Sequence, residues 1–275
     1  MRSLFAASGL LLLPLLSSGC LFSPDSDDDG LSNSKEKREG TDPENNDGML
    51  DGDEVDAGSS PSAWDSDGDG YSDYSEFLEG TDPNDASSVV YDHGWPHNAF
   101  KEELTDPGFD EVAKAGDSIG RLLTVDQYGN EVDLYDWGGQ NKPILLDVSA
   151  EWCGPCQQMS DWLSGGQNNS YLAEYAAVRD AVDAGDILWV TVLSEDNYGD
   201  SPSQQVLANW DEEYHHPNIV VMADEDYAVL TQLNLRAYPS VYMIGADMKL
   251  IETAGMFNNL RALDRALEWV ESQGE

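Results

Sequence analysis

The hydrophobic and polar positions divide the chain into an apolar run at 4–16, an acidic stretch rich in glycine, and a region of alternating patterns that begins at about Gly116. In this last region, short apolar runs of the buried type predict strands at 143–149, 187–193, 219–222 and 240–244. Helical spacing predicts helices at 157–163, 171–182, 204–214 and 227–233, and a last helix capped by Asn258. Strands that alternate with helices indicate an α/β domain built around one sheet.

A β-hairpin is expected at the start of this domain. Residues 122–125 and 132–134 have strand-like patterns, and the turn between them carries Gly129 and Asn130. The predicted organisation therefore has four parts: a signal segment at 1–19, an acidic tether at 20–91, a connecting segment at 92–115 and the folded domain at 116–275.

The first twenty residues have the layout of an export signal. Arg2 precedes the apolar run, and small residues lead from it to Cys20. The run is shorter than the ~20 residues of a membrane-spanning helix. The segment resembles the bacterial lipobox, although Ser17 stands where that family usually has Leu. The resemblance implies a lipidated Cys20 and, because Leu21 follows it, a protein held at the outer membrane on its periplasmic or cell-surface side; loss of Cys20 with a cleaved peptide is the alternative.

The acidic tether contains a repeat with the ligand spacing of a cation loop. Two segments, DSDDDGLSNSKE at 25–36 and DSDGDGYSDYSE at 65–76, place oxygen side chains at loop positions 1, 3, 5 and 9, glycine at 6 and glutamate at 12. Ca²⁺ needs this spacing, because it takes six to eight oxygens, a tight turn and a bidentate carboxylate. The candidate ligands are Asp25, Asp27, Asp29, Asn33 and Glu36 in the first loop, and Asp65, Asp67, Asp69, Asp73 and Glu76 in the second.

The phrase EGTDP follows both loops, at 39–43 and 79–83, and a degenerate third loop begins between them at Pro43. These features resemble the thrombospondin type 3 class of calcium repeats. The resemblance implies a calcium-stiffened spacer, with an extracellular-type dissociation constant of about 10⁻⁴ to 10⁻³ M. The alternative is a disordered acidic linker that meets ions only diffusely.

Charge and cysteine content exclude several classes of function. The chain has 54 Asp and Glu against 13 Lys and Arg, a formal net charge of −41. Nucleic-acid binding is excluded because phosphate contacts need clustered basic residues. The three cysteines, at 20, 153 and 156, exclude a zinc site with four sulfur ligands.

Trp152-Cys153-Gly154-Pro155-Cys156 follows a predicted buried strand and opens a predicted helix. The free N–H groups and positive dipole end of that helix favour a thiolate on Cys153. Cys153 would attack a substrate disulfide, and Cys156 would resolve the mixed disulfide. A metal half-site would need further soft ligands. The Gly-Pro pair and the preceding strand are features of disulfide-exchange sites and not of inert structural disulfides, so we interpret the motif as a redox site.

The domain resembles thioredoxin over about residues 116–272, through AEWCGPC at 150–156, Asp147 and Ala237-Tyr238-Pro239. The resemblance implies a thioredoxin-like fold, in which helices flank a central mixed sheet. It also implies that Asp147 is a buried acid that takes the proton of Cys156, and that Pro239 is a cis-proline beside the substrate peptide. The alternative for Asp147 is a polar residue at a strand end.

The hairpin at 126–137 and the long stretch at 194–230 resemble the membrane-anchored periplasmic branch of thiol-disulfide oxidoreductases, which shares its architecture with peroxiredoxins. Three residues depart from thioredoxin. Trp189 and Thr191 occupy the strand where thioredoxin has a lysine, and Gln157 replaces the usual lysine after the second cysteine.

The leading hypothesis is a lipid-anchored thiol-disulfide oxidoreductase that exchanges disulfides with exported proteins and needs no organic cofactor. The Gly-Pro pair resembles reducing family members, and a reductase in an oxidising compartment needs a membrane electron donor as its partner. Trp152 and Tyr238 are the hypothetical determinants of substrate preference. One alternative is a thiol peroxidase, which is disfavoured because Leu146 and Ala150 stand where peroxiredoxins have Pro and Thr or Ser. The other is a calcium-dependent attachment module with a non-catalytic redox domain.

Overall fold

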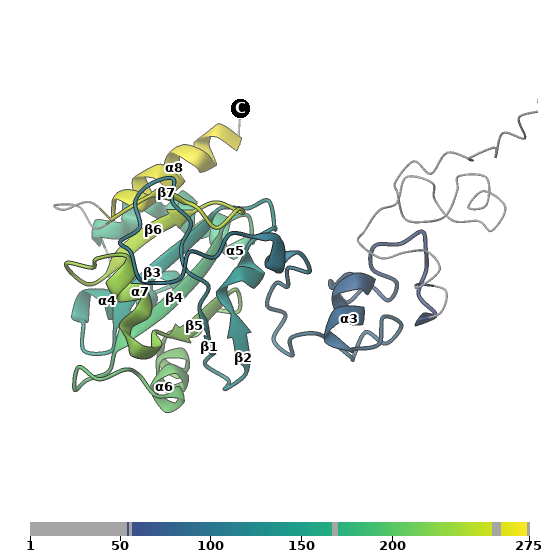
Figure 1. Cartoon of the computed structure of the whole chain (residues 1–275). Helices are drawn as coiled ribbons and strands as arrows, with labels where there is room; N and C mark the ends of the chain where they lie inside the picture. The colour runs from purple at the N-terminus through teal and green to yellow at the C-terminus, as the bar shows by residue number, and fades with distance from the viewer. Residues whose placement is uncertain (1–53, 55–56, 167–169, 255–259, 274–275) are drawn as a thin grey trace, which may run out of the picture. The chain divides into compact units, whose positions relative to one another are not determined.

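The computed structural model describes residues 54, 57–166, 170–254 and 260–273 (Figure 1). The chain divides into two compact units, 1–64 and 65–275. The apolar run, Cys20 and Asn258 lie outside the described residues, as do the ligands predicted in the loop 25–36. The second unit contains the second predicted cation loop and the α/β domain.

A five-stranded mixed sheet forms the centre of the second unit, in the order β5-β4-β3-β6-β7. Strands β3, β4 and β5 are parallel, β6 runs antiparallel to β3, and β7 runs antiparallel to β6. The strands are β3 (Ile144–Ala150), β4 (Leu188–Glu195), β5 (Ile219–Ala223), β6 (Ser240–Ile244) and β7 (Leu250–Glu252). Every residue of β3 and β5 is buried, which is why these strands appear as apolar runs in the sequence. The predicted α/β class and mixed sheet are confirmed.

The side chains of β3 alternate between two apolar clusters. Leu145 packs against the helices α4 and α8, whereas Leu146 packs against the hairpin side of the sheet. The cluster that contains Leu145 includes residues of α4 (Gly154–Leu163), η3 (Ser170–Tyr175), α5 (Ala176–Asp183) and α8 (Arg261–Gln273). The period of two along a strand places Asp147 on the same face as Leu145, beneath α4.

The opposite face is covered by the predicted hairpin and by short helical segments. Strands β1 (Leu123–Val125) and β2 (Glu131–Asp133) form an antiparallel pair, as the sequence predicts. They are followed by η2 (Leu134–Trp137), and α7 (Ala228–Gln232) supplies Val229 to the same cluster. Helix α6 (Gln204–Tyr214) packs instead near the cysteines, with Leu207 and Trp210 in the cluster that contains Cys153.

Two elements differ from the prediction. The predicted helix at 171–182 is a 3-10 segment followed by α5, and the predicted helix at 227–233 is shortened to α7. The second difference has a local cause, because Asp226 (φ 55°) and Tyr227 (φ 57°) adopt left-handed conformations that cannot continue a helix. A further 3-10 turn, η4 (Glu225–Tyr227), contains these two residues.

The segment 91–101, which we call the strap, joins the second cation loop to the sheet domain. Trp95 in the strap is buried, and its Nε1 donates to Asp126 over 2.9 Å. The buried Asp136 accepts from the Tyr91 hydroxyl over 2.6 Å and from Lys101 Nζ over 2.8 Å. A short 3-10 turn, η1 (Lys101–Glu103), begins at the last residue of the strap. Part of the predicted connecting segment is therefore packed against the domain.

The loop and its helix contact the strap directly. Helix α3 (Asp73–Glu79) follows the loop, and its Glu79 lies 3.0 Å from His97 Nε2. The Tyr71 hydroxyl donates to the Trp95 carbonyl oxygen over 2.8 Å, in a buried hydrogen bond. Within the second unit, the loop is thus tied to the domain by side chains as well as by the chain itself.

Candidate redox site and candidate cation loop

Cys153 and Cys156 are joined by a disulfide at the start of α4, with their Cα atoms 5.2 Å apart. Cys153 is the N-cap residue, and its Sγ accepts a hydrogen bond from the Cys156 N–H over 3.2 Å. Pro155 lies in the first turn, where its missing N–H costs nothing. Cys156 is fully buried and Cys153 is 3% exposed. The helix start that the sequence predicts for the cysteines is confirmed.

Asp147 lies in the middle of β3 and has no exposed surface. Burial raises the pKa of its carboxyl group to about 7, although hydrogen bonds from Ser149 and Thr191 oppose this shift. Thr191 pairs with Asp147 across the β3–β4 ladder, and its Oγ1 accepts from Trp189 Nε1 over 3.2 Å. On the strand where thioredoxin has a lysine, Thr191 thus presents a hydroxyl to Asp147. A carboxyl group with a pKa near 7 can accept or donate a proton at neutral pH.

The peptide bond between Tyr238 and Pro239 is cis, as the resemblance to thioredoxin implies. Tyr238 packs against the apolar cluster that contains both cysteines, and its ring lies edge-to-face with that of Trp152, with 5.6 Å between centroids. Trp152 is 50% exposed. An aromatic pair thus stands beside the disulfide.

Sequence reasoning missed Glu195, which connects these two aromatic residues. Its Oε2 accepts from Trp152 Nε1 over 2.8 Å, and its Oε1 accepts from the Tyr238 hydroxyl over 3.2 Å. Glu195 is the last residue of β4, at the carboxyl end of a strand parallel to β3. The sequence carried one usable signal, because ligand-binding residues of open α/β sheets gather at the carboxyl ends of the strands.

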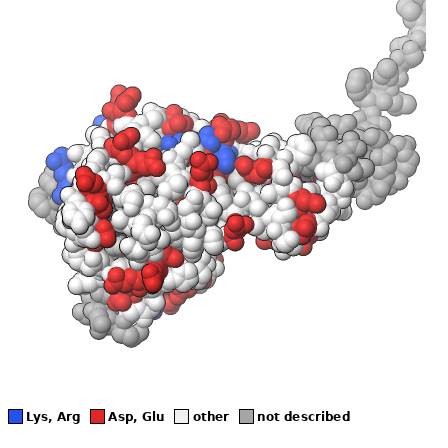
Figure 2. All heavy atoms as spheres, turned by 90° about the horizontal axis from the view of Figure 1, so that it is seen from below, with Lys and Arg blue, Asp and Glu red and all other residues white. Residues whose placement is uncertain are grey.

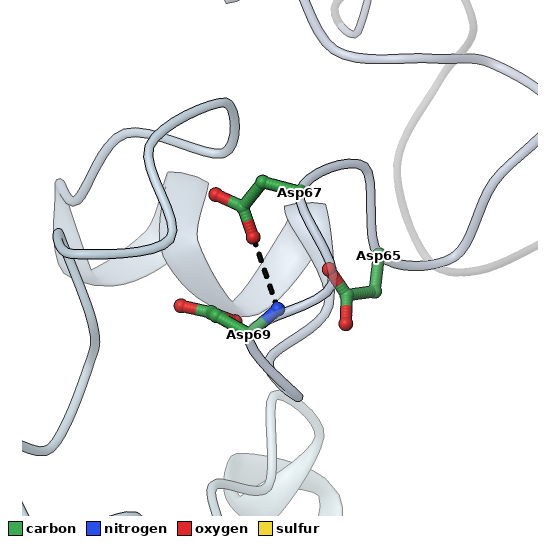
Figure 3. A group of neighbouring side chains, drawn as sticks. All are labelled: Asp65, Asp67 and Asp69. Atoms are coloured by element: carbon green, nitrogen blue, oxygen red, sulfur yellow. Dashed lines mark hydrogen bonds between the residues drawn. The ribbon is translucent and has the colours of Figure 1, made fainter.

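The second cation loop brings together three of its predicted ligands. Carboxylate oxygens of Asp65, Asp67 and Asp69 lie within 4.8 Å of one another (Figure 3). One oxygen of Asp67 accepts from the Asp69 N–H over 3.2 Å, which is the dashed line in Figure 3. Asp65 accepts from Gly68 and Gly70 N–H groups. Gly70 has φ +103°, which explains the requirement for glycine at position 6 of the loop.

The remaining oxygens of this loop fit a hard cation. Asp67 Oδ2, Asp69 Oδ2 and Glu76 Oε2 are buried and have no hydrogen-bond partner among the described residues. Burial, followed by the charges of Asp69 and Asp67, raises the pKa of Glu76 to about 7. A bound Ca²⁺ would satisfy these oxygens and relieve the repulsion between the carboxylates.

Asp73, the predicted ligand at position 9, is placed differently. Its two carboxylate oxygens accept from the N–H and the hydroxyl of Ser66, over 2.8 Å and 2.7 Å. Asp73 therefore closes the loop onto its second residue and lies outside the group of three aspartates.

The mixed sheet, the cis-proline and the paired cysteines at a helix start define a thioredoxin-like redox protein. The model of the redoxin family matches residues 107–267, and the chain belongs to this family. The model of the bacterial TSP3 repeat, a calcium-binding type of repeat, matches residues 25–45, 46–61 and 65–86. The matches include both predicted loops and the degenerate loop between them, which is divided between the first two matches.

Several solved structures are similar to the chain. The exposed lipoprotein thioredoxin of Streptococcus pneumoniae is 22% identical, with a TM-score of 0.39 over 54% of this chain and 99% of that one. A thiol:disulfide interchange protein from Bacteroides sp. is 18% identical, with a TM-score of 0.41 over 58% and 91%. A thiol peroxidase from Chromobacterium violaceum is 15% identical, with a TM-score of 0.41 over 61% and 93%. A search of curated proteins found no match.

Among the described residues, no helix combines the length and the apolar character needed to cross a bilayer.

Proposed function

We propose that the protein is a thiol-disulfide oxidoreductase that reduces disulfides of exported proteins through Cys153 and Cys156. The observation that carries this proposal is the cysteine pair at the start of α4, on the sheet face that also holds the buried Asp147. A cysteine at this N-cap faces the free N–H groups and the positive end of the helix dipole, which stabilise a thiolate.

Two exchange steps follow from this arrangement. The Cys153 thiolate attacks one sulfur of the substrate disulfide, a Cys153–substrate bond forms, and the other substrate sulfur leaves as a thiolate. Asp147 then takes the proton of Cys156, whose thiolate attacks Cys153 Sγ and releases the second substrate sulfur. The substrate gains two electrons and the protein becomes the disulfide form, so each turnover requires a donor of two electrons. We propose that this donor is a membrane protein.

We further propose that the TSP3 repeats bind calcium and that Cys20 carries a lipid anchor at the outer membrane, on its periplasmic or cell-surface side. In the second loop, Asp65, Asp67, Asp69 and Glu76 would hold the ion, and the unpartnered buried oxygens support this assignment. The export-type sequence before Cys20 supports the anchor. Replacement of Cys20 by Ser, with release of the protein from membranes as the expected result, tests the anchor.

The reduction potential of the Cys153–Cys156 pair tests the enzymatic proposal, with Cys153→Ser as control. A value below about −240 mV supports a reductase, whereas a value above about −180 mV would assign the protein to disulfide formation instead. Cys156→Ser should trap a mixed disulfide with substrate, which mass spectrometry detects. Consumption of hydrogen peroxide that depends on Cys153 would favour the peroxidase alternative.

A further inference from the structure

Glu195 joins two aromatic residues that border the disulfide, the exposed Trp152 and the half-buried Tyr238. We propose that Glu195, Trp152 and Tyr238 form a cation-binding subsite, which selects polypeptide disulfides that carry Lys or Arg beside the reacting cysteine. This inference rests on the proposed function, because it names the substrate class of the same site.

The three side chains come from separate elements and meet through the carboxylate. Each oxygen of Glu195 accepts one hydrogen bond, from Trp152 Nε1 over 2.8 Å or from the Tyr238 hydroxyl over 3.2 Å. A carboxylate offers about four acceptor positions, so both oxygens retain acceptor capacity for a ligand. Glu195 and Tyr238 are half-buried, and Trp152 is half exposed. The subsite is therefore held in place and still open to solvent.

The chemistry of the subsite fits a cation. Lys and Arg side chains are attracted to the faces of Trp and Tyr rings, and they form charge-assisted hydrogen bonds with carboxylates. Burial, followed by the charge of Glu195, raises the pKa of Tyr238 well above its usual value. Tyr238 thus stays a neutral hydrogen-bond donor to the Glu195 carboxylate.

The subsite lies where a substrate must pass. Trp152 precedes Cys153 in the chain, and Tyr238 packs against the apolar cluster that contains Cys153 and Cys156. Because Cys153 is 3% exposed, a substrate sulfur reaches it only by close approach of the flanking polypeptide. That approach places neighbouring substrate side chains against the aromatic pair.

The surrounding charge favours a basic partner. Within two positions of the three subsite residues, the other charged side chains are the acidic Glu151 and Asp196 and the basic Arg236. Over the whole chain, 54 Asp and Glu stand against 13 Lys and Arg, and one face of the molecule, shown in Figure 2, likewise carries more acidic than basic side chains. Charge complementarity of this kind speeds encounter and suppresses wrong partners.

The test compares three disulfide peptides of equal length whose residue next to cysteine is Lys, Gln or Glu. The reduced full chain is mixed with each peptide, and the rate of peptide reduction is measured at low salt. We expect the Lys peptide to react about tenfold faster than the Glu peptide, from one ion pair and one cation–π contact. Added salt should reduce the difference.

Matched variants separate specificity from a general charge effect. Glu195→Gln should lose most of the Lys preference, and Glu195→Asp, which keeps the charge, should retain part of it. Glu271→Gln removes one exposed charge near the end of α8 and should leave the preference unchanged. Tyr238→Phe keeps the ring but removes the hydrogen bond to Glu195, so a smaller loss is expected.

Two results would overturn the inference while leaving the proposed function intact. One is an unchanged Lys preference in Glu195→Gln, and the other is an equal loss of rate with all three peptides, which indicates a merely structural role. If the wild-type protein reduces none of the peptides, the proposed function fails and the inference fails with it.

Discussion

The hydroxyl of Ser149 lies 2.9 Å and 3.0 Å from the two carboxylate oxygens of Asp147, and both residues have no exposed surface. A hydroxyl that donates to a carboxylate favours its charged form, whereas burial favours its neutral form. The balance leaves the pKa of Asp147 at about 7, with burial as the larger effect. Stability and exchange rate should both depend on pH through this group.

Asp147→Asn should stabilise the disulfide form at pH 8. The unfolded state binds fewer protons than the folded state between about pH 4 and 7, so the wild type loses stability as pH rises through this window. The loss is on the order of 4 kcal/mol, because each pKa unit corresponds to about 1.4 kcal/mol and the pKa rises from 3.8 to about 7. Urea unfolding at pH 4 and pH 8 measures it. If the free energies of unfolding of variant and wild type differ by the same amount at both pH values, the prediction is contradicted.

Ser149→Ala should raise the pKa of Asp147 further, since it removes a hydrogen bond to the charged form. If Asp147 accepts the proton of Cys156, the pH at which exchange reaches half its maximal rate should then increase by about one unit. The pH profile of disulfide reduction is the measurement, and Ser272→Ala, at the far end of α8, is the control. A profile that does not move would exclude Asp147 as the base.

Calcium should stabilise the chain that begins at Cys20. A dissociation constant of about 10⁻⁴ to 10⁻³ M gives about 1–3 kcal/mol at about 10 mM calcium. Glu76→Gln should lose much of this calcium-dependent increase in the free energy of unfolding. Glu76 is fully buried, and its Oε2 has no hydrogen-bond partner among the described residues. Thermal or denaturant unfolding with calcium and with a chelator measures the effect. The exposed Glu103 provides a matched control, Glu103→Gln, which should respond to calcium like the wild type.

Tyr71→Phe should destabilise the second unit by about 1 kcal/mol, the usual contribution of one hydrogen bond. The lost bond joins the cation loop to the Trp95 carbonyl oxygen in the strap. We expect faster proteolysis of the strap in this variant. Tyr74→Phe, whose ring lies 5.7 Å from that of Phe100, keeps the Tyr71 hydroxyl and serves as control. If the two variants have the same stability and the same rate of proteolysis, the Tyr71 hydrogen bond does not hold the loop against the strap.

The inner strands of the sheet could be predicted from the sequence because fully buried strands consist of continuous apolar runs. It placed four of the five strands of the central sheet, β3 to β6, within a few residues of their observed bounds. It missed β7, which has three residues at the sheet edge, of which Leu250 alone is buried. Three residues are too few to show the alternation of apolar and polar positions that distinguishes a strand from a loop.

The chemistry of the cysteines and of the cation loop was determined by the sequence alone, because each depends on spacing along a few residues. The start of α4 fixes the positions of Cys153 and Cys156 relative to each other. A tight turn at Gly70 does the same for Asp65 and Asp69.

The tertiary structure decided which distant residues join these local sites. Glu195 meets Trp152 and Tyr238 across 43 positions in each direction along the chain, and Tyr71 meets Trp95 across 24. Such contacts depend on strand order and register, which place the ends of β4 and of the loop before β6 beside the cysteines. No short-range pattern encodes that arrangement, because it exists only once the sheet has formed.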